Sequence, residues 1–342
     1  MDEARLDNRT EFAAYPQMLL DVDGEKLVTV VKATFEVKDG DLELAPPERM
    51  RPVRQADIPW GEPEISSIAY PADLCLRKPG TDVVVVGCAH APGGVPVPRI
   101  DVRVEVGRLK KSLAVFGPRV WQSATSFSAP TPFSELELRY EYAFGGFDDS
   151  DPENVVEEPR NPIGSGKVAV ASARIGTPAP RIEDPAALLD DLGVDPKPTG
   201  VGALGRHWAP RRDHVGTYDA IWSETQCPLL PTDFDDRHHL CAAPDLIARP
   251  PLVGGEQVSL LNLLPGGGVL QLTLPKIEVA LEFRVEGREP VRFTPHLDTV
   301  LVDTLLTGPD KPPAIELCWR AHVVAPRRLK AAKIIVTERD VP

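Results

Sequence analysis

Histidine and cysteine, side chains that zinc prefers as ligands, are concentrated in one stretch of the sequence. This stretch contains His207, His214, Cys227, His238, His239 and Cys241. The adjacent His238 and His239 cannot easily both point at one ion, and no Cys-x-x-Cys or His-x-x-x-His spacing recurs. We therefore expect no metal site, and we expect the purified protein to carry neither a metal nor a cofactor.

Residues 200–205, with glycines at 200, 202 and 205, match the spacing of a dinucleotide-binding loop. Such a loop needs a strand before it and a helix after it, because the glycine backbone and the helix N-terminus together hold the pyrophosphate. Here Pro196 and Pro198 precede the glycines and Pro210 follows them. The match therefore indicates chance or glycine-dependent turns and not a nucleotide site.

The sequence offers weak support for hydrolytic chemistry. A Gly-x-Ser-x-Gly elbow, which would present a nucleophilic serine, does not occur. Asp233 and Asp235 could act as paired carboxylates in glycoside hydrolysis, but Pro231 and Thr232 before them favour an Asx-type turn. We expect no catalytic residues and a protein that is not an enzyme. A carbohydrate-active β-sandwich enzyme is the alternative.

One local patch combines basic and aromatic side chains. Its members are Arg206, Trp208, Arg211, Tyr218 and Trp222, with Arg212 beside them. Protein interfaces are enriched in Trp, Tyr and Arg, which bury large areas or make forked hydrogen bonds. Arginines also commonly stack on aromatic rings or bind loop carbonyls inside their own domain. The patch is a candidate protein-binding surface, and internal packing is the alternative for each residue.

The overall charge narrows the classes of partner. The chain of 342 residues has 38 basic and 51 acidic side chains, which gives a formal net charge of -13. This charge argues against nonspecific binding to nucleic acid and against docking on anionic membranes. A hydrophobic content of 42% is sufficient for a substantial core.

Nothing in the sequence indicates export or membrane insertion. Residues 1–5 provide neither a basic n-region nor an apolar h-region, and no apolar run approaches the roughly 20 residues of a membrane helix. The 5 cysteines are an odd number without close-paired spacing, so reduced and mostly buried thiols are expected. We therefore expect a cytoplasmic protein.

Alternating apolar and polar residues predict an all-β fold. Three strands are expected between residues 18 and 45, because Asp23-Gly24 and Asp39-Gly40 suit hairpin turns. Residues 83–86 are a continuous apolar run, which is typical of a strand buried on both faces. Further strands are predicted at residues 100–106, 136–144, 269–274, 277–285, 297–306, 315–323 and 333–337.

The strand-rich segments flank an irregular middle. We divide the chain into a β-rich region at residues 1–147, a Gly-, Pro- and aromatic-rich tract at 148–250 and a second β-rich region at 251–342, or one compact unit. The predicted architecture is a turn-rich β-sandwich, either one large sandwich or two closely packed ones, with few short helices. Residues 46–79 and 148–161 are expected to be surface excursions.

The one helix signal covers residues 184–193. Asp184 can cap the first turn, Pro185 is tolerated at the first helical position, and Gly193 can end the helix in a left-handed conformation. We therefore predict a single short helix there.

Several segments, in their order along the chain, carry a resemblance to a known family. They are residues 31–35, 81–85, 117–121, 144–146, 161–166, 205–211, 216–222, 230–235, 298–300 and 318–320. Together they resemble a bacterial family of unknown-function domains encoded in type VI secretion gene clusters, whose members serve as adaptors, or chaperones, for secreted toxins.

The resemblance implies a non-enzymatic role. It implies that the protein binds a type VI secretion effector, by the effector's N-terminal region or a spike-tip domain, and helps to load it onto the spike protein before firing. Besides the carbohydrate-active enzyme, a structural accessory subunit of the secretion apparatus is an alternative.

Overall fold

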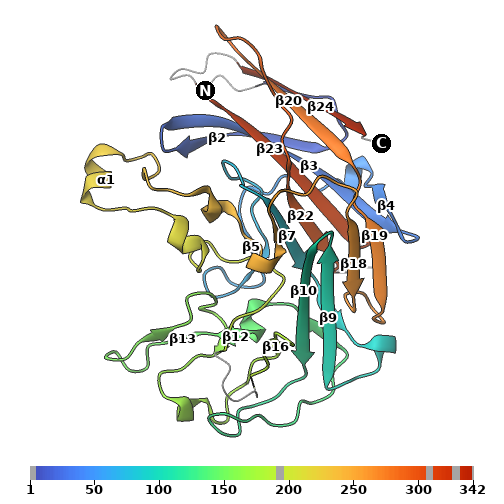
Figure 1. Ribbon diagram of the computed structural model, residues 1–342, viewed down its shortest axis with the longest axis vertical. Coiled ribbons are helices and arrows are strands. Elements are labelled where there is room, and N and C mark those ends of the chain that lie inside the picture. The colour runs from blue at the N-terminus through green and yellow to red at the C-terminus, as the bar shows by residue number, and fades with distance from the viewer. Residues whose placement is uncertain (1–4, 190–195, 306–310, 326–331, 341–342) are drawn as a thin grey trace.

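Strands dominate the computed structural model, which describes residues 5–189, 196–305, 311–325 and 332–340. Strands hold 42% of the chain and helical turns 9%, and the predicted all-β class is therefore confirmed. Three larger sheets contain most of the strand residues, and the irregular middle of the chain lies to the left of and below them in Figure 1.

The largest sheet has seven strands and is central to the fold. In order across the sheet they are β17 (Ile247–Ala248), β7 (Thr81–Val86), β22 (Leu297–Asp303), β23 (Ala314–Val324), β3 (Gly24–Lys38) and β2 (Ala13–Asp21), with β4 (Asp41–Leu44) also paired to β3. Neighbouring strands are antiparallel except β7 and β22, which run parallel. The three strands predicted between residues 18 and 45 are confirmed as β2, β3 and β4.

Two further sheets accompany the central one. A five-stranded sheet contains β16 (Ile182–Glu183), β10 (Leu109–Phe116), β9 (Arg99–Val106), β18 (Gln257–Leu261) and β19 (Val269–Thr273). A four-stranded sheet contains β1 (Arg5–Asn8), β24 (Ala332–Asp340), β20 (Ile277–Val285) and β21 (Val291–Phe293). Each of the three sheets combines strands from both sides of the irregular tract, for example β3 with β23, β9 with β18 and β1 with β24.

The remaining elements are short. The two-stranded ribbons are β5 (Ile58–Pro59) with β6 (Ile68–Tyr70), β8 (Cys88–His90) with β11 (Glu135–Glu137), β12 (Phe144–Gly145) with β15 (Ser165–Gly166), and β13 (Phe147–Asp148) with β14 (Val156–Glu157). The helical elements are α1 (Ala220–Thr225) and the 3-10 turns Pro47–Arg49, Pro92–Gly94, Tyr140–Tyr142, Ala171–Arg174, Arg211–His214, Asp236–His239 and Pro244–Leu246. None of the helices in the described ranges has the length and apolar character that a membrane crossing requires.

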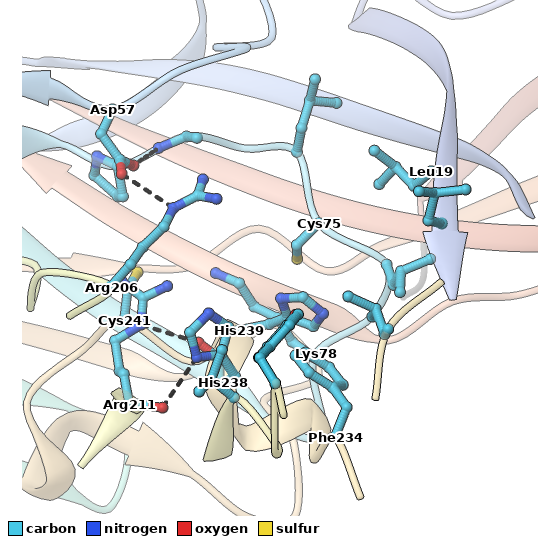
Figure 2. A pocket seen from close by; sticks show the side chains of 18 residues that line it. Leu19, Asp57, Cys75, Lys78, Arg206, Arg211, Phe234, His238, His239 and Cys241 are labelled. Atoms are coloured by element: carbon cyan, nitrogen blue, oxygen red, sulfur yellow. Dashed lines mark hydrogen bonds and ion pairs between the residues drawn. The ribbon is translucent and has the colours of Figure 1, made fainter. Parts of the chain in front are cut away.

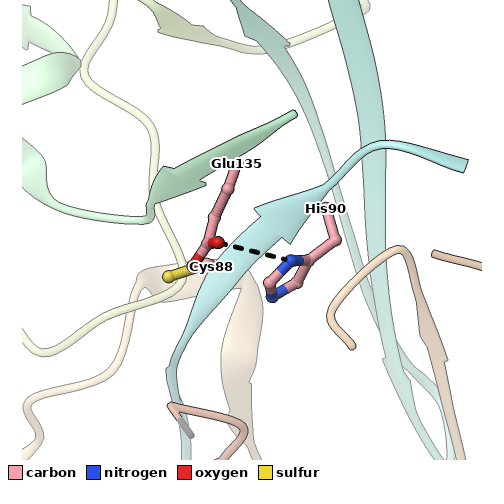
Figure 3. Close-up of side chains that lie close together, drawn as sticks. All are labelled: Cys88, His90 and Glu135. Carbon is pink, nitrogen blue, oxygen red and sulfur yellow. Dashed lines mark ion pairs between the residues drawn. The ribbon is translucent and has the colours of Figure 1, made fainter. Parts of the chain in front are cut away.

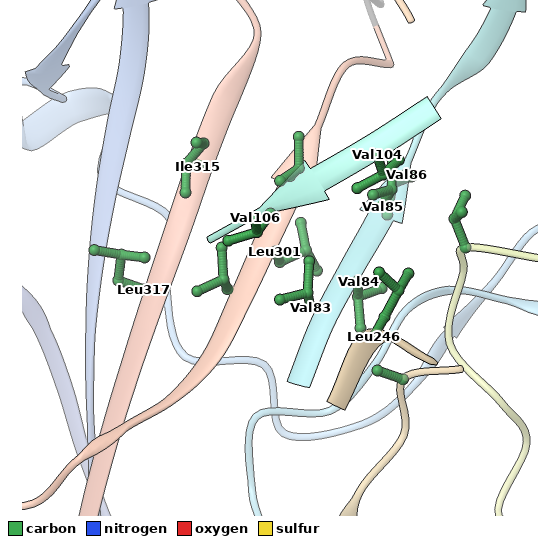
Figure 4. Close-up of a cluster of buried hydrophobic side chains, with 14 of the residues drawn as sticks. Val83, Val84, Val85, Val86, Val104, Val106, Leu246, Leu301, Ile315 and Leu317 are labelled. Atoms are coloured by element: carbon green, nitrogen blue, oxygen red, sulfur yellow. The ribbon is translucent and has the colours of Figure 1, made fainter. Parts of the chain in front are cut away.

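The main hydrophobic core lies where β9 crosses over the central sheet (Figure 4). Val104 and Val106 of β9 are fully buried together with Val83 of β7, Leu301 of β22 and Leu317 of β23. Burial of these side chains stabilises the fold by about 25 cal/mol for each Å² of apolar surface that is removed from water. The same hydrophobic cluster contains residues from Phe12 to Val336, so that the flanking regions share one core.

The opposite face of the central sheet is also buried, although it carries charges. On β3, Val31 and Ala33 join the hydrophobic core, whereas Lys32 between them points to the other face and is 0% exposed. On β23, Glu316 and Arg320 are buried in the same way. Alternation along these strands therefore separates an apolar buried face from a charged buried face.

Equal numbers of cations and carboxylates meet on this face among the described residues, and we call this set the buried charge network. The cations are Lys32, Arg51, Arg54, Lys78 and Arg320, and the carboxylates are Asp73, Asp82, Asp298, Asp303 and Glu316. Buried charges are tolerated only when they are paired and hydrogen-bonded, because removing each ion from water costs several kcal/mol.

Glu316 is the most connected carboxylate of the network. Its Oε2 lies 2.7 Å from Lys32 Nζ and 2.7 Å from Arg54 Nη1, and its Oε1 lies 2.8 Å from Arg51 Nη1. Lys32 also donates to Asp73 Oδ2 at 2.9 Å. Arg51, Arg54 and Asp73 belong to residues 46–79, so these bonds join the sheet to the segment that covers it.

Residues 46–79, which we call the covering segment, pack on the charged face. Residues 46–79 were predicted to form a surface excursion, but Val53, Asp73, Leu76 and Lys78 are buried. The segment packs on the charged face because its Arg51, Arg54 and Asp73 supply the counter-charges that this face requires. The excursion at residues 148–161 is instead a short hairpin, β13 with β14, whose base buries Glu158.

The strand predicted at residues 136–144 is wrong in its second half. β11 ends at Glu137, and a 3-10 turn at Tyr140–Tyr142 follows. The buried Asn161 side chain donates hydrogen bonds to the carbonyl oxygens of Tyr140 at 2.8 Å and of Phe144 at 3.0 Å. These bonds tie the backbone to a side chain instead of to a neighbouring strand.

The helix predicted at residues 184–193 does not form over its described part. Asp184 accepts a hydrogen bond from the Ala186 amide at 2.9 Å, and its carbonyl accepts one from Ala187 at 3.0 Å, which makes a tight turn. Glu183 then accepts the Leu189 amide at 2.8 Å, so that local carboxylates take up the amides. Residues 190–193 lie outside the described residues.

Acid should weaken the fold through Glu316. Burial alone would raise the pKa of this carboxyl, but Lys32, Arg54 and Arg51 lower it from 4.5 to about 2. A lowered folded-state pKa stabilises the fold above the pKa of the unfolded chain, and this contribution is lost as the pH falls from 4.5 toward 2. Urea unfolding at a series of pH values should show that loss.

The variant Glu316→Gln should remove the effect. It leaves Lys32 without its full counter-charge, so the free energy of unfolding at neutral pH should drop by about 3–5 kcal/mol. Its stability should also depend less on pH between 4.5 and 2 than that of the unmodified protein. Glu62→Gln, at an exposed carboxylate, is the control. Parallel pH curves for the unmodified protein and Glu316→Gln would contradict the assignment.

Candidate functional site

A cavity of about 230 Å³ lies between the edge strand β2, the covering segment and the middle tract (Figure 2). Its walls are apolar and come from all three parts of the chain: Leu19 and Leu20, Leu74 and Leu76, and Leu230 and Phe234. β2 is the last strand of the central sheet, and its Pro16 suits an edge because proline has no amide hydrogen to donate. The cavity therefore opens beside an edge strand of the central sheet.

The floor of the cavity is polar and touches the buried charge network. Lys78 Nζ lies 2.8 Å from Asp82 Oδ2 and donates to Thr299 Oγ1 at 2.9 Å. Burial alone would lower the pKa of Lys78, but the Asp82 carboxylate raises it above its ordinary value. Lys78 is therefore held as a cation by the network.

The floor also contains thiols that stay protonated. Burial raises the pKa of Cys241 to about 12, and Asp82, which accepts a hydrogen bond from the Cys241 amide at 2.9 Å, acts in the same direction. Burial likewise raises the pKa of Cys75, whose Sγ lies 2.6 Å from Arg320 Nη1. A thiol reacts as its thiolate, so neither cysteine is activated as a nucleophile.

His239 differs from the other polar groups of the floor in its buried, neutral imidazole. Burial lowers its pKa to about 2, and the nearby Arg320 and His238 add to the effect. Its Nε2 is enclosed and has no hydrogen-bond partner among the residues that the structure describes. A neutral imidazole with a free nitrogen can exchange a hydrogen bond with a group that enters the cavity.

Two residues of the predicted patch, Trp208 and Arg211, are internal. Trp208 is 7% exposed and meets Tyr140 edge to face, with ring centroids 5.4 Å apart. Arg211 donates to the carbonyl oxygens of Leu204 at 2.7 Å and of His238 at 3.0 Å. Gly205 packs on the Trp208 indole, where a Cβ would come within 2.7 Å of Nε1. Internal packing therefore accounts for both side chains.

The other residues of the patch lie closer to the surface. Arg206 donates to Asp57 Oδ2 at 3.2 Å on the rim of the cavity, and Tyr218 is 49% exposed and lines it. Trp222 is half-buried, stacks edge-on against Tyr218 and donates from Nε1 to the Leu229 carbonyl at 3.0 Å. Asp219 caps α1 by accepting the Trp222 amide at 2.8 Å. Arg206 and Tyr218 thus meet at the cavity, and Trp222 supports Tyr218.

The glycines at residues 200–205 are close-packing positions, and none of the three has the positive φ that a glycine-dependent turn requires. Gly200 lies against the Tyr140 ring, where a Cβ would come within 2.7 Å of a ring carbon, and Val201 accepts a hydrogen bond from the Val85 amide at 2.8 Å. The segment continues into turns and a 3-10 turn at Arg211–His214, not into an α-helix. The geometry that a pyrophosphate needs is not formed in this segment.

Asp233 and Asp235 both stabilise turns. Asp235 accepts the Arg237 amide at 2.8 Å, which is the expected Asx-type turn, and pairs with the Arg237 side chain. Asp233 instead accepts from the Thr217 amide at 3.0 Å and the Thr217 hydroxyl at 2.7 Å, and so ties two loops together. Both carboxylates therefore already form hydrogen bonds within the chain.

The structure places only three of the candidate zinc ligands of the middle tract at the cavity. His238, His239 and Cys241 line the cavity, whereas His207, His214 and Cys227 do not. His238 Nδ1 lies 3.0 Å from the Arg211 carbonyl oxygen, which occupies that nitrogen. The expectation that these residues hold no metal stays a prediction.

Sequence reasoning missed the residues that complete the cavity. Leu19, Leu74 and Lys78 lie far from the middle tract in the sequence, and each reads locally as an ordinary strand or loop residue. The exposed Leu20 at the end of β2 offers a weak signal, because an apolar residue at a sheet edge often marks contact with another segment.

Residues 23–320 match the model of a family described as an uncharacterized protein conserved in bacteria (DUF2169). The chain belongs to this family. No curated protein and no solved structure matches it.

The DUF2169 match covers most of the cavity but not all of it. Leu19 and Leu20 precede the matched residues, whereas the covering segment and the middle tract lie within them. Four of the segments that the sequence analysis singled out each supply one charge of the buried network. These charges are Lys32, Asp82, Asp298 and Arg320.

Removing the Trp208 ring should destabilise the protein. Trp208→Ala deletes a buried aromatic side chain that packs on Tyr140, so the free energy of unfolding should fall by about 3–5 kcal/mol. Phe147→Ala is the matched control, because Phe147 is 56% exposed and its loss should change stability by about 0.5 kcal/mol or less. Denaturant unfolding measures both. Equal stability of the two variants would show that the indole is not a packing element.

Proposed function

We propose that the protein is a non-enzymatic adaptor, or chaperone, that binds a type VI secretion effector and helps to load it onto the spike. The segments that resemble the adaptor family support this role. The structural observation that carries the proposal is the cavity beside the β2 edge, with the exposed side chains of Leu20 and Tyr218 on its lining.

The size and lining of the cavity suit a side chain of a partner protein. Small-molecule sites usually enclose about 300–1,000 Å³, whereas this cavity encloses about 230 Å³. Apolar side chains, mainly leucines, form its walls, and the neutral His239 at its floor can bond to a polar atom of the entering group. An apolar side chain with adjoining main chain meets both features.

The surroundings of the cavity resemble a protein interface. Tyr218 is 49% exposed, Ile221 on the neighbouring α1 is 70% exposed, and Leu20 is 37% exposed. Arg206 on the rim uses its guanidinium on Asp57 and is itself half-exposed. Aromatic, aliphatic and arginine side chains around a small pocket are the usual composition of an interface centre.

The alternative roles receive no specific support. A carbohydrate-active enzyme would require free carboxylates in a cleft, and Asp233 and Asp235 are occupied by Thr217 and Arg237. A structural accessory subunit would remain in the assembled secretion apparatus at a fixed stoichiometry, whereas an adaptor would not.

Capture of the effector should depend on Tyr218. Tyr218→Ala removes an exposed anchor, so binding should weaken by about 1–2 kcal/mol or more, which corresponds to roughly 5–30-fold in affinity. Phe147→Ala, an equally exposed aromatic away from the cavity, should bind normally. Co-expression with the effector and spike proteins encoded beside the gene, followed by pulldown and titration, measures the effect.

Two results would contradict the proposal at different levels. Unchanged capture by Tyr218→Ala would exclude the cavity as the binding surface but keep the adaptor role. Failure of the unmodified protein to capture any neighbouring effector or spike component would exclude the adaptor role itself.

A further inference from the structure

The ribbon of β8 and β11 places three potential metal ligands on one face. Glu135 pairs with His90 in the antiparallel register, and Glu137 pairs with Cys88. Residues two apart on a strand and residues directly opposite each other across a ribbon share a face. Cys88, His90 and Glu135 accordingly point toward one another in Figure 3.

The three side chains are close enough to share an ion. One ligand atom from each lies within 4.8 Å of the other two. Zinc bonds of about 2.0–2.3 Å in a tetrahedral arrangement place ligand atoms roughly 3–4 Å apart. Small side-chain rotations would therefore bring the Cys88 sulfur, a His90 nitrogen and a Glu135 oxygen to bonding distance.

His90 is buried, but its ring nitrogens form no hydrogen bond with the described residues. Only 8% of the residue is exposed. Its Nδ1 lies 4.0 Å from a Glu135 carboxylate oxygen, which is too long for a hydrogen bond. The ring nitrogens are not among the fully enclosed polar atoms, so they are open to a ligand that enters the adjoining cavity.

The local charge favours a cation. The Glu135 carboxylate is 58% exposed at the mouth of the group, and the Cys88 thiol, which is buried beside it, becomes a thiolate when it binds a metal. Glu137 on the same ribbon pairs with Arg139 at 3.2 Å and is not counted as a ligand. A thiolate and a carboxylate together match the charge of a divalent ion.

The group borders a second cavity, separate from the proposed docking cavity. This cavity encloses about 310 Å³ and is also lined by Gly94, Ser134 and Thr304. With three ligands from the protein, a tetrahedral ion keeps one position, which here would face the cavity and accept water or a donor atom from another molecule.

We propose that Cys88, His90 and Glu135 form a binding site for a divalent transition-metal ion. Zinc is the best match, because it accepts sulfur, nitrogen and oxygen ligands together, whereas Mg²⁺ and Ca²⁺ require oxygen ligands. The ion links β8 to β11. Since only the folded chain brings these ligands together, metal binding stabilises the fold.

Cobalt provides a direct test, because Co²⁺ bound by a thiolate shows a near-ultraviolet charge-transfer absorption. The full chain is stripped with a chelator, reduced and titrated with Co²⁺, and Zn²⁺ is then added as a competitor. We expect one equivalent of Co²⁺ to produce the thiolate band and Zn²⁺ to abolish it. The melting temperature should rise with added Zn²⁺.

Variants assign the band to the three residues. Cys88→Ser should abolish the band, and His90→Gln should weaken Zn²⁺ affinity by at least about 100-fold, since even changes around a metal's ligands cost about 10–100-fold. Glu135→Gln changes a half-exposed side chain, preserves the fold and should also weaken the affinity. The controls are Cys227→Ser and His207→Gln, at exposed positions, which should bind as the unmodified protein does.

Three results would overturn the proposal. The first is an unmodified protein without a thiolate band. The second is Glu135→Gln with unchanged Zn²⁺ affinity. The third is a band that survives Cys88→Ser but disappears in Cys241→Ser, which would place the ion in the docking cavity instead.

Discussion

The fold depends on the neutralisation of charges on a buried face of its central sheet. Lys32 and Glu316 are both 0% exposed on neighbouring strands, and neither could stay there unpaired, because an isolated buried ion costs several kcal/mol. The strands alone do not complete the network. Arg51, Arg54 and Asp73 come from the covering segment, so this proline-rich stretch must fold against the sheet for the sheet to be stable.

In the irregular middle tract, the buried groups that need partners belong to the backbone. Amide and carbonyl groups that do not pair in sheets must find other partners when they are buried. Asn161 and Arg211 provide them by donating from their side chains to the carbonyl oxygens of Tyr140, Phe144 and Leu204. Buried polar side chains thus hold an irregular chain in one conformation, and this chain forms part of the walls of the cavity beside β2.

The two cavities differ in chemistry because different parts of the fold form them. The docking cavity lies where the covering segment, the sheet edge and the middle tract meet, so it combines apolar walls with a floor supplied by the charge network. The second cavity lies at a short ribbon whose register brings a cysteine, a histidine and a glutamate to one face. The partner-binding site and the metal site that we propose therefore lie in separate parts of one scaffold.

The sequence by itself determined the elements whose signals are local. Alternation and the Asp-Gly turns defined β2, β3 and β4, the apolar run defined β7, and the Asx turn at Asp235 followed from its neighbours. These predictions succeed because hairpin turns and strand alternation depend on residues close together in the chain. The failures at residues 136–144 and 184–193 arose where a side chain took up backbone groups and ended the regular structure.

Only the tertiary structure decided which faces are covered and by what. The pattern around Lys32 and Glu316 is the same for a face in water and for a face paired with counter-charges, so alternation alone could not reveal a second buried layer. Trp208 and Tyr218 belong to the same aromatic patch in the sequence, yet one is buried against Tyr140 and the other is exposed at a cavity. That cavity joins Leu19, Lys78 and His239, and the metal-ligand group joins His90 to Glu135. Contacts between such distant segments depend on how the whole chain packs, and no local pattern encodes them.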